Sequence, residues 1–290
     1  MTSKTKEQDK KVSDKYEKLS HIEHVLKRPS MYVGSIENRL EDVYIFDNEL
    51  NKIIKKNINY NAGLLKLFDE IILNAFDETI RPDTATNLIK VNINKENNSI
   101  SIMNNSHGIP VLFKEEHNTW IPAMLMGELM SSSNFNDNEK RFTSGTNGVG
   151  SSLVNIFSKE FTLENIDDIR HKSFKMTWSN NMSEKSEAEI KSCRKKGMVT
   201  VTFIPDLEKF GLTELSDDII NLFKKRTYDI ACNTNKNVSV YYNDEKIPIK
   251  KFENYIKLYL PSDNTNKIII DENTNENWSV GLLMSDDNFN

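Results

Sequence analysis

The sequence contains little cysteine and no histidine cluster. Two cysteines, Cys193 and Cys232, occur among 290 residues, and they are far apart with no CxxC pair. This excludes a disulfide framework and a cysteine-rich zinc site, and it fits a reducing compartment inside the cell. The five histidines form no metal motif either, because His21 and His24 have no third candidate ligand near them in the sequence.

Long apolar runs and a positive net charge are also missing. No hydrophobic run approaches the roughly 18 to 20 residues that span a bilayer, and the charged N-terminus has no signal-peptide core. The net charge is −5, so the chain as a whole is not a nucleic-acid-binding surface, and a nucleic-acid partner would have to be contacted locally or elsewhere. A hydrophobic fraction of 37% over 290 residues is enough for a substantial core in one large domain or two ordinary ones.

Residues 63–78 have the pattern of an amphipathic helix, with apolar side chains at helical spacing until Pro82. Glu70, Asn74 and Asp77 follow at i, i+4 and i+7, which places them on one stripe. The stripe borders apolar residues, where a carboxylate costs free energy unless it is partnered or faces a cleft. Two interpretations follow: a solvated acidic edge, or a site in which a general base lies one turn from an amide oxygen that binds a hard cation.

The order of the remaining segments favours an α+β fold. Residues 1–15 have almost no apolar content and are expected to be a disordered tail. A capping box at Ser20 begins a short helix, residues 31–34 are expected to be a brief extended piece with a turn, and the pattern over 36–60 assigns no element. Further elements are expected as a hairpin over 88–103, a helix over 120–130, strands at 159–164, 172–178 and 198–204, a helix over 215–232, a hairpin over 237–249, a helix at 252–259 and strands at 267–270 and 278–284. This order predicts a mixed sheet with helices on one face.

A glycine-rich segment, Gly145-x-x-Gly148-x-Gly150, precedes the start of a helix. Glycines let backbone N–H groups approach phosphate oxygens, so the segment is a candidate anion cradle. A turn that merely begins a helix explains it equally well. It is not a Walker A loop, since no Gly-Lys-Ser/Thr follows, and it is not a Rossmann fingerprint, since a charged loop precedes it rather than a strand.

Three motifs occur in a fixed order, and the combination is more specific than any one of them. They are Glu-x-x-x-Asn-x-x-Asp on a helix, Asn104-x-x-x-Gly108 at a strand end, and the glycine-rich segment. This set resembles the GHKL ATPases, and five further segments resemble the N-terminal ATPase region of type IIA DNA topoisomerases. The likeness covers roughly residues 16–284, is strongest to the eukaryotic and large-DNA-virus branch, and includes some likeness to T-even phage subunits. The five segments are residues 22–35, 68–75, 132–135, 203–207 and 226–231.

The resemblance implies a two-layer Bergerat sandwich that binds ATP and Mg²⁺. It assigns Glu70 as the general base, Asn74 as a Mg²⁺ ligand and Asn104 as the residue that contacts the adenine amino group. Asp77 is implied to orient the metal shell or the nucleotide, with a plain surface acid as the alternative. The segment implied to contact ribose and phosphates is Ser132, Ser133 and Asn134, and the implied phosphate lid is Gly145, Thr146, Asn147, Gly148, Val149, Gly150, Ser151 and Ser152.

The chain departs from the family pattern at three positions. Ser106 replaces a glycine, and we expect it to shift the backbone. Thr146 and Ser152 stand where eukaryotic members carry arginine and lysine, so two positive charges that would face the triphosphate are missing. Phage-type members share the Gly-Val-Gly-Ser-Ser form seen here, so the loss of these charges need not abolish ATP binding. The expected site is therefore less positive and relies more on backbone donors and Mg²⁺.

The resemblance also implies a domain division and a function. Residues 16–250 would form the ATPase domain with an N-terminal arm, and 251–290 the start of a transducer domain that stops before its phosphate-contacting lysine. The expected function is an ATP-operated clamp that dimerises on ATP binding and drives DNA strand passage in the full-length enzyme, in the nucleus or a viral replication compartment, without a membrane partner. The fragment alone is expected to be a slow ATPase without DNA cleavage. The alternatives are a GHKL chaperone or mismatch-repair ATPase, and a catalytically weak nucleotide-binding dimerisation module.

Overall fold

The computed structural model describes residues 16–81, 84–131, 148–261, 268–275 and 278–283. The expected disordered tail, residues 1–15, lies outside these ranges. None of the helices in the described part of the chain combines the length and the apolar content needed to cross a bilayer.

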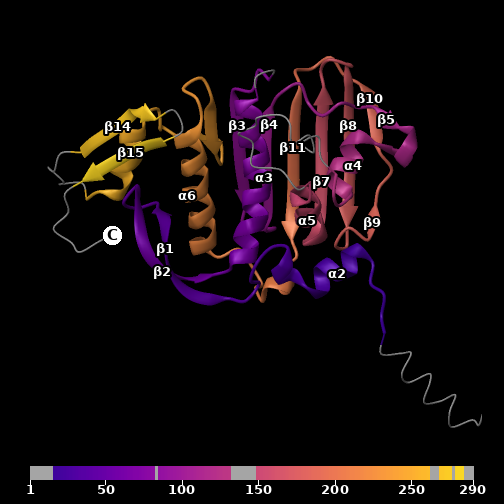
Figure 1. The fold of residues 1–290 in the computed structure, drawn as a ribbon, viewed down its shortest axis with the longest axis horizontal. Helices are drawn as coiled ribbons and strands as arrows, with labels where there is room; N and C mark the ends of the chain where they lie inside the picture. The colour runs from indigo at the N-terminus through magenta and orange to yellow at the C-terminus, as the bar shows by residue number, and fades with distance from the viewer. Residues whose placement is uncertain (1–15, 82–83, 132–147, 262–267, 276–277, 284–290) are drawn as a thin grey trace, which may run out of the picture.

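A nine-stranded sheet runs through the molecule in the order β10-β8-β7-β11-β4-β3-β12-β13, with β9 paired to β8 (Figure 1). The β12–β3 pair is parallel, whereas the other pairs in this sheet are antiparallel. The predicted mixed sheet of an α+β fold is therefore confirmed. Its strands are β3 (Leu88–Asn94), β4 (Ser99–Asn105), β7 (Ser158–Asp167), β8 (Lys172–Ser179), β9 (Glu184–Lys185), β10 (Glu189–Ser192), β11 (Met198–Pro205), β12 (Ser239–Tyr242) and β13 (Glu245–Lys246).

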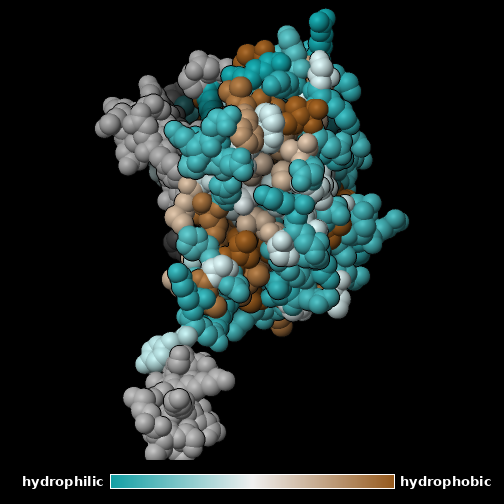
Figure 2. Space-filling model, turned by 90° about the vertical axis from the view of Figure 1, so that its right-hand side faces the viewer, coloured by the Kyte–Doolittle hydropathy of each residue, from teal (hydrophilic) through white to brown (hydrophobic). Residues whose placement is uncertain are grey.

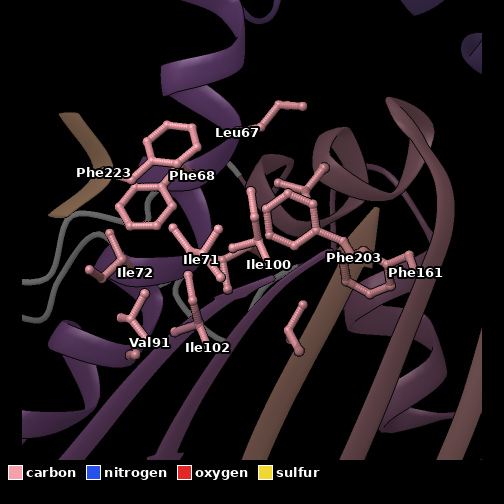
Figure 3. Close-up of a cluster of buried hydrophobic side chains, with 14 of the residues drawn as sticks. Leu67, Phe68, Ile71, Ile72, Val91, Ile100, Ile102, Phe161, Phe203 and Phe223 are labelled. Atoms are coloured by element: carbon pink, nitrogen blue, oxygen red, sulfur yellow. The ribbon is translucent and has the colours of Figure 1, made fainter. Parts of the chain in front are cut away.

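Helices pack on one face of this sheet, and the core lies between the two layers (Figure 1). Phe68 of α3 stacks on Phe223 of α6 with ring centroids 4.4 Å apart. Figure 3 shows Ile71 on the same helix pointing toward Ile100 and Ile102 of β4. The helices are α2 (His21–Lys27), α3 (Ala62–Ile80), α4 (Ile121–Gly127), α5 (Gly150–Ile156) and α6 (Asp217–Asn233).

Helix α3 extends the predicted helix over residues 63–78 by a few residues at its ends. The Asn61 side chain caps it by accepting from Leu64 N at 3.0 Å. Gly63 lets its first turn approach the preceding segment: its N–H donates to Ser35 O at 2.8 Å, and a Cβ there would lie 3.1 Å from the same oxygen. The Asn61 cap fixes the start of α3.

Two parts of the N-terminal region differ from expectation. Residues 36–60, which the sequence pattern left unassigned, form the antiparallel hairpin of β1 (Arg39–Asp47) and β2 (Lys52–Tyr60). At 31–34, where a brief extended piece with a turn was predicted, the turn forms, but Met31 is not extended because a 3₁₀-helix, η1 (Pro29–Met31), ends there. The N–H groups of Tyr32 and Val33 both donate to Pro29 O at 2.9 Å, which closes the chain into a turn.

The C-terminal part begins with α7 (Phe252–Ile256) and continues into a 3₁₀-helix, η4 (Lys257–Tyr259), where one helix was predicted. Two antiparallel strands follow, β14 (Ile268–Asn275) and β15 (Trp278–Leu283). Gly281 lets β15 lie against α7, because a Cβ there would collide with Ile256. The remaining short elements are β5 (Phe113–Lys114), η2 (Glu115–His117), β6 (Thr119–Trp120) and η3 (Leu207–Phe210).

Candidate nucleotide-binding site

A cavity of about 510 Å³ opens between α3, the loop after β4, α4 and the start of α5. Its volume is in the range of small-molecule sites. Apolar residues line much of the cavity beside a smaller number of polar and charged side chains, which is the usual composition of a small-molecule site. The apolar lining consists of Ile71, Ala75, Ile102, Ile109, Pro110, Leu125, Met126, Val149, Val199 and Val201.

The polar stripe of α3 faces this cavity rather than solvent. Glu70, Asn74 and Asp77 all line it, and Asp77 is only 4% exposed. Asn104 of β4 lines the same cavity from the sheet. The structure therefore brings together four of the predicted site residues, and the interpretation of the stripe as a solvated acidic edge is wrong.

The Glu70 carboxylate is held between a cation and a glycine. The Lys66 ammonium forms an ion pair with Glu70 Oε1 from one turn earlier on α3. On the other side lies Gly150, the first residue of α5, where a Cβ would collide with Glu70 Oε2. A side chain at this position would therefore force the Glu70 carboxylate or α5 to shift.

The Asn74 side chain is oriented by α5. Its Nδ2 donates to Ser151 Oγ at 3.0 Å, which leaves the amide oxygen as the atom for a ligand. Within the described ranges, no group of three or more histidine, cysteine, aspartate or glutamate side chains is arranged to hold a metal ion. A single amide oxygen nevertheless suits Mg²⁺, which keeps several waters and shares phosphate oxygens.

Asn104 carries a buried donor with no partner. The residue is 5% exposed, and its Nδ2 makes no hydrogen bond to any residue that the structure describes. A buried donor left unpaired costs free energy, so such a group in a cavity indicates a ligand that accepts from it. The fit to the Watson–Crick edge of a base is good, because an amide both donates and accepts.

The loop after β4 depends on Gly108 and is stabilised by Ser106. Gly108 has φ +76°, and a Cβ there would collide with Ile166 O, so this position requires glycine. Ser106 does not have positive φ, and its Oγ accepts from Gly108 N at 3.0 Å. The loop therefore accommodates the serine without strain, whereas we expected it to disturb the backbone.

The predicted phosphate lid is only partly in the described chain. Gly148, Val149, Gly150 and Ser151 line the cavity. Ser152 does not: it is 1% exposed, and its Oγ donates to Glu128 O at 2.7 Å, behind the cavity wall. Its prediction as a nucleotide contact is not supported by this position. The other predicted contacts lie outside the described residues: Ser132, Ser133, Asn134, Gly145, Thr146 and Asn147.

Sequence reasoning missed three charged residues that line the cavity: Lys66, Glu78 and Arg81. Burial raises the pKa of Glu78 above its usual value, while Arg81, whose Nη1 lies 3.3 Å from Glu78 Oε1, acts in the opposite direction. Lys66 lies four residues before Glu70, and Arg81 four residues after Asp77. The same helical spacing extended in both directions would have found both, and each is paired with a carboxylate of α3, Lys66 with Glu70 and Arg81 with Glu78.

A mixed sheet covered by helices on one face, with a polar cavity between a helix, a strand-end loop and a glycine-rich helix start, is the arrangement of a GHKL ATPase domain. The crystal structure of the ATPase region of Saccharomyces cerevisiae topoisomerase II superposes with a TM-score of 0.89 at 40% identity, over 94% of this chain and 72% of that chain. The chain belongs to the DNA topoisomerase 2 family, in which it corresponds to the N-terminal ATPase region.

Two relatives show how far the likeness extends. DNA topoisomerase 2 of Acanthamoeba polyphaga mimivirus is 43% identical over 286 residues, or 97% of this chain and 22% of that protein. DNA topoisomerase 2 of Plasmodium falciparum is 46% identical over 256 residues, or 87% of this chain and 18% of that protein. The chain thus spans about a fifth of the length of these relatives. No family model matches it.

Proposed function

We propose that the chain binds ATP in this cavity and hydrolyses it with Glu70 as the general base. The observation that carries the proposal is the placement of the Glu70 carboxylate between Lys66 and Gly150, beside the Asn74–Ser151 pair. Phosphoryl transfer needs chiefly a positioned water, charge neutralisation and alignment. These residues are suited to the first two tasks.

In the proposed reaction, Glu70 accepts a proton from a water molecule whose oxygen attacks the γ-phosphorus. The bond from that phosphorus to the bridging oxygen breaks, and ADP and phosphate leave. Lys66 holds the carboxylate by its ion pair, while Gly150 allows α5 to close against it. Helix α3 therefore supplies the proposed general base and its cationic partner, and α5 packs against the carboxylate.

Mg²⁺ and the adenine ring occupy different parts of the cavity in this proposal. The Asn74 amide oxygen would hold Mg²⁺, which neutralises charge on the phosphate oxygens. Asn104 would bind the edge of adenine with its unpartnered amide, and Ile102 and Val201 belong to the apolar lining. The nucleotide would then extend from β4 toward Glu70.

Glu70→Gln tests the assignment of the base. We expect the variant to bind ATP with Mg²⁺ within a few-fold of the unaltered chain in calorimetry, and to release phosphate about 10² to 10⁴ times more slowly. Glu96→Gln, in the exposed turn between β3 and β4, is the matched control and should leave both values unchanged. Equal phosphate release by Glu70→Gln would remove Glu70 as the base. ATP binding with no phosphate release by the unaltered chain would instead support a nucleotide-binding module.

We further propose that ATP operates the chain as a clamp, in which two copies dimerise and the full-length enzyme passes one DNA segment through another. Family membership supports this, since the relatives are DNA topoisomerases. Sedimentation with and without a non-hydrolysable ATP analogue tests the first step. We expect a shift from monomer to dimer with the analogue; a monomer at saturating analogue would argue against the clamp.

A further inference from the structure

Unneutralised positive charge gathers at one end of the nine-stranded sheet, where β7 turns into β8 and β10 leads into β11. We call this cluster the basic edge; it consists of Arg170, Lys172, Arg194, Lys195 and Lys196. All but the half-buried Lys172 are exposed. Figure 2, which views the molecule from the side of β8 and β10, shows hydrophilic residues projecting at the upper end of this face.

Strand pairing and loop hydrogen bonds hold the two turns of the basic edge together. Lys172 pairs with Asp167 of β7 on one side and with Ser192 of β10 on the other. Cys193 N donates to His171 O at 2.8 Å. Asp168 Oδ2 accepts from the N–H of Gly197, the residue after the last lysine, at 3.1 Å. The cations therefore form one fixed surface rather than two separate loops.

The nearby carboxylates leave four of these cations without a partner. Asp167 is 1% exposed and pairs with Arg170 at 3.2 Å, while Asp168 contacts His107 at 2.9 Å. The other four side chains of the basic edge form no ion pair with any residue in the described part of the chain. Several lysines elsewhere on the same sheet are paired, as Lys175 is with Glu164 at 3.0 Å and Lys191 with Glu189 at 3.0 Å.

We propose that the basic edge binds the phosphate backbone of duplex DNA. Four unpaired cations on one ridge match a row of phosphates, and a chain with a net charge of −5 approaches a polyanion only where its charge is locally positive. The choice of DNA rests on the proposed function, whereas the binding surface does not need ATP. Contacts of this kind position a duplex without reading its sequence.

The basic edge is also joined to the nucleotide cavity. Asp168 N donates to His107 O at 3.2 Å, and the residues on either side of His107, Ser106 and Gly108, line the cavity. A duplex on the basic edge would thus rest against the turn that supports the adenine end of the site. Asp168, which bonds to His107 in this turn, also accepts from Gly197 and so helps to fix the basic edge.

Counterion release sets the expected size of the effect. Four phosphate contacts predict a slope of about −3.6 for log K against log salt, which is about a 150-fold loss of affinity between about 50 and 200 mM salt. The triple variant Arg194→Gln, Lys195→Gln and Lys196→Gln leaves one unpaired cation, so its loss over the same range should be about fourfold.

Fluorescence anisotropy with a labelled duplex of about 25 base pairs, without nucleotide, tests the proposal. The matched control removes three positive charges at the opposite edge of the sheet: Lys246→Gln, Lys250→Gln and Lys251→Gln. We expect the triple variant of the basic edge to show the shallow slope and the control to keep the slope of the unaltered chain. ATP binding, measured beside each titration, should be the same for all three proteins.

Each other outcome is decisive. If the unaltered chain binds no duplex, or if the control loses as much slope as the variant, the basic edge is not a DNA surface. Binding to phosphatidylserine vesicles but not to the duplex would also overturn the proposal. If the unaltered chain binds the duplex but does not bind ATP, the proposed function is refuted and the DNA surface is not. The two failures are therefore distinguishable.

Discussion

Arg226 of α6 donates from Nε to Asp69 Oδ1 of α3 across 2.9 Å, and Asp69 is the residue before Glu70. The same guanidinium donates from Nη1 to Asp229 at 2.8 Å. Asp229 in turn accepts from the Tyr255 hydroxyl of α7 at 2.6 Å. A continuous polar chain therefore joins the helix of the proposed base to the first helix of the C-terminal part.

Replacing Arg226 should destabilise the domain, because it leaves the largely buried Asp69 carboxylate without its partner. Burial raises the pKa of Asp69, and the Arg226 partner acts against that rise. Arg226→Met leaves Asp69 without its ion-pair partner, while Asp229 keeps Lys225 at 2.9 Å, so we expect a loss of about 3 kcal/mol in the free energy of unfolding, measured by urea titration. The double variant with Asp69→Asn should recover part of the loss. Strict additivity of the two single losses would show that the pair is not coupled.

Gly150→Ala should impair turnover more than binding. The added Cβ would collide with Glu70 Oε2, so either the carboxylate or α5 must move. A displacement of about 1 Å at a reacting group can cost about 100-fold in rate, and we expect a loss of that order in phosphate release. Gly63→Ala, in the first turn of α3, is the control, since its Cβ would meet Ser35 O at 3.1 Å rather than Glu70. Equal rates for both variants would show that contact with Glu70 is unimportant.

Asn104→Ala should separate ligand binding from stability. The Nδ2 group of Asn104 has no partner among the described residues, so its removal forfeits no hydrogen bond in the free chain. We expect ATP affinity in calorimetry to fall about tenfold to 100-fold, while the free energy of unfolding changes by less than about 1 kcal/mol. Unchanged ATP affinity would place the adenine elsewhere in the cavity.

The parts of the fold that the sequence predicted well are those set by local periodicity. Helix α3 and the β3–β4 hairpin carry a strong apolar pattern of their own, and both formed as expected. The β1–β2 hairpin was not assigned, because the two buried residues of β1, Ile45 and Phe46, are adjacent rather than alternating, and β2 interrupts its apolar residues with lysine and asparagine. Its place is set by packing against α6, which no local pattern records.

The site shows the same division between local and tertiary information. The stripe through Glu70 and Asn74 could be found because helical spacing alone places those side chains together. Ser152 could not be excluded in the same way. Which face of a seven-residue helix meets a cavity depends on its neighbours, and here α5 turns Ser151 toward Asn74 and Ser152 toward Glu128 O.

Cys232, near the C-terminal end of α6, should be unreactive toward alkylation at neutral pH. Burial, with the carboxylates of Asp229 and Glu272 adding to it, raises the pKa of its thiol from 9.0 to about 11. Because the thiolate is the nucleophile, its fraction at about pH 8 falls roughly 100-fold relative to an unshifted thiol. We expect mass spectrometry after brief iodoacetamide treatment to show slow labelling of Cys232 that rises about tenfold per pH unit toward pH 11. Rapid labelling at about pH 8, with Cys193 as the internal reference, would mean that the thiol is not shielded by the packing of α6.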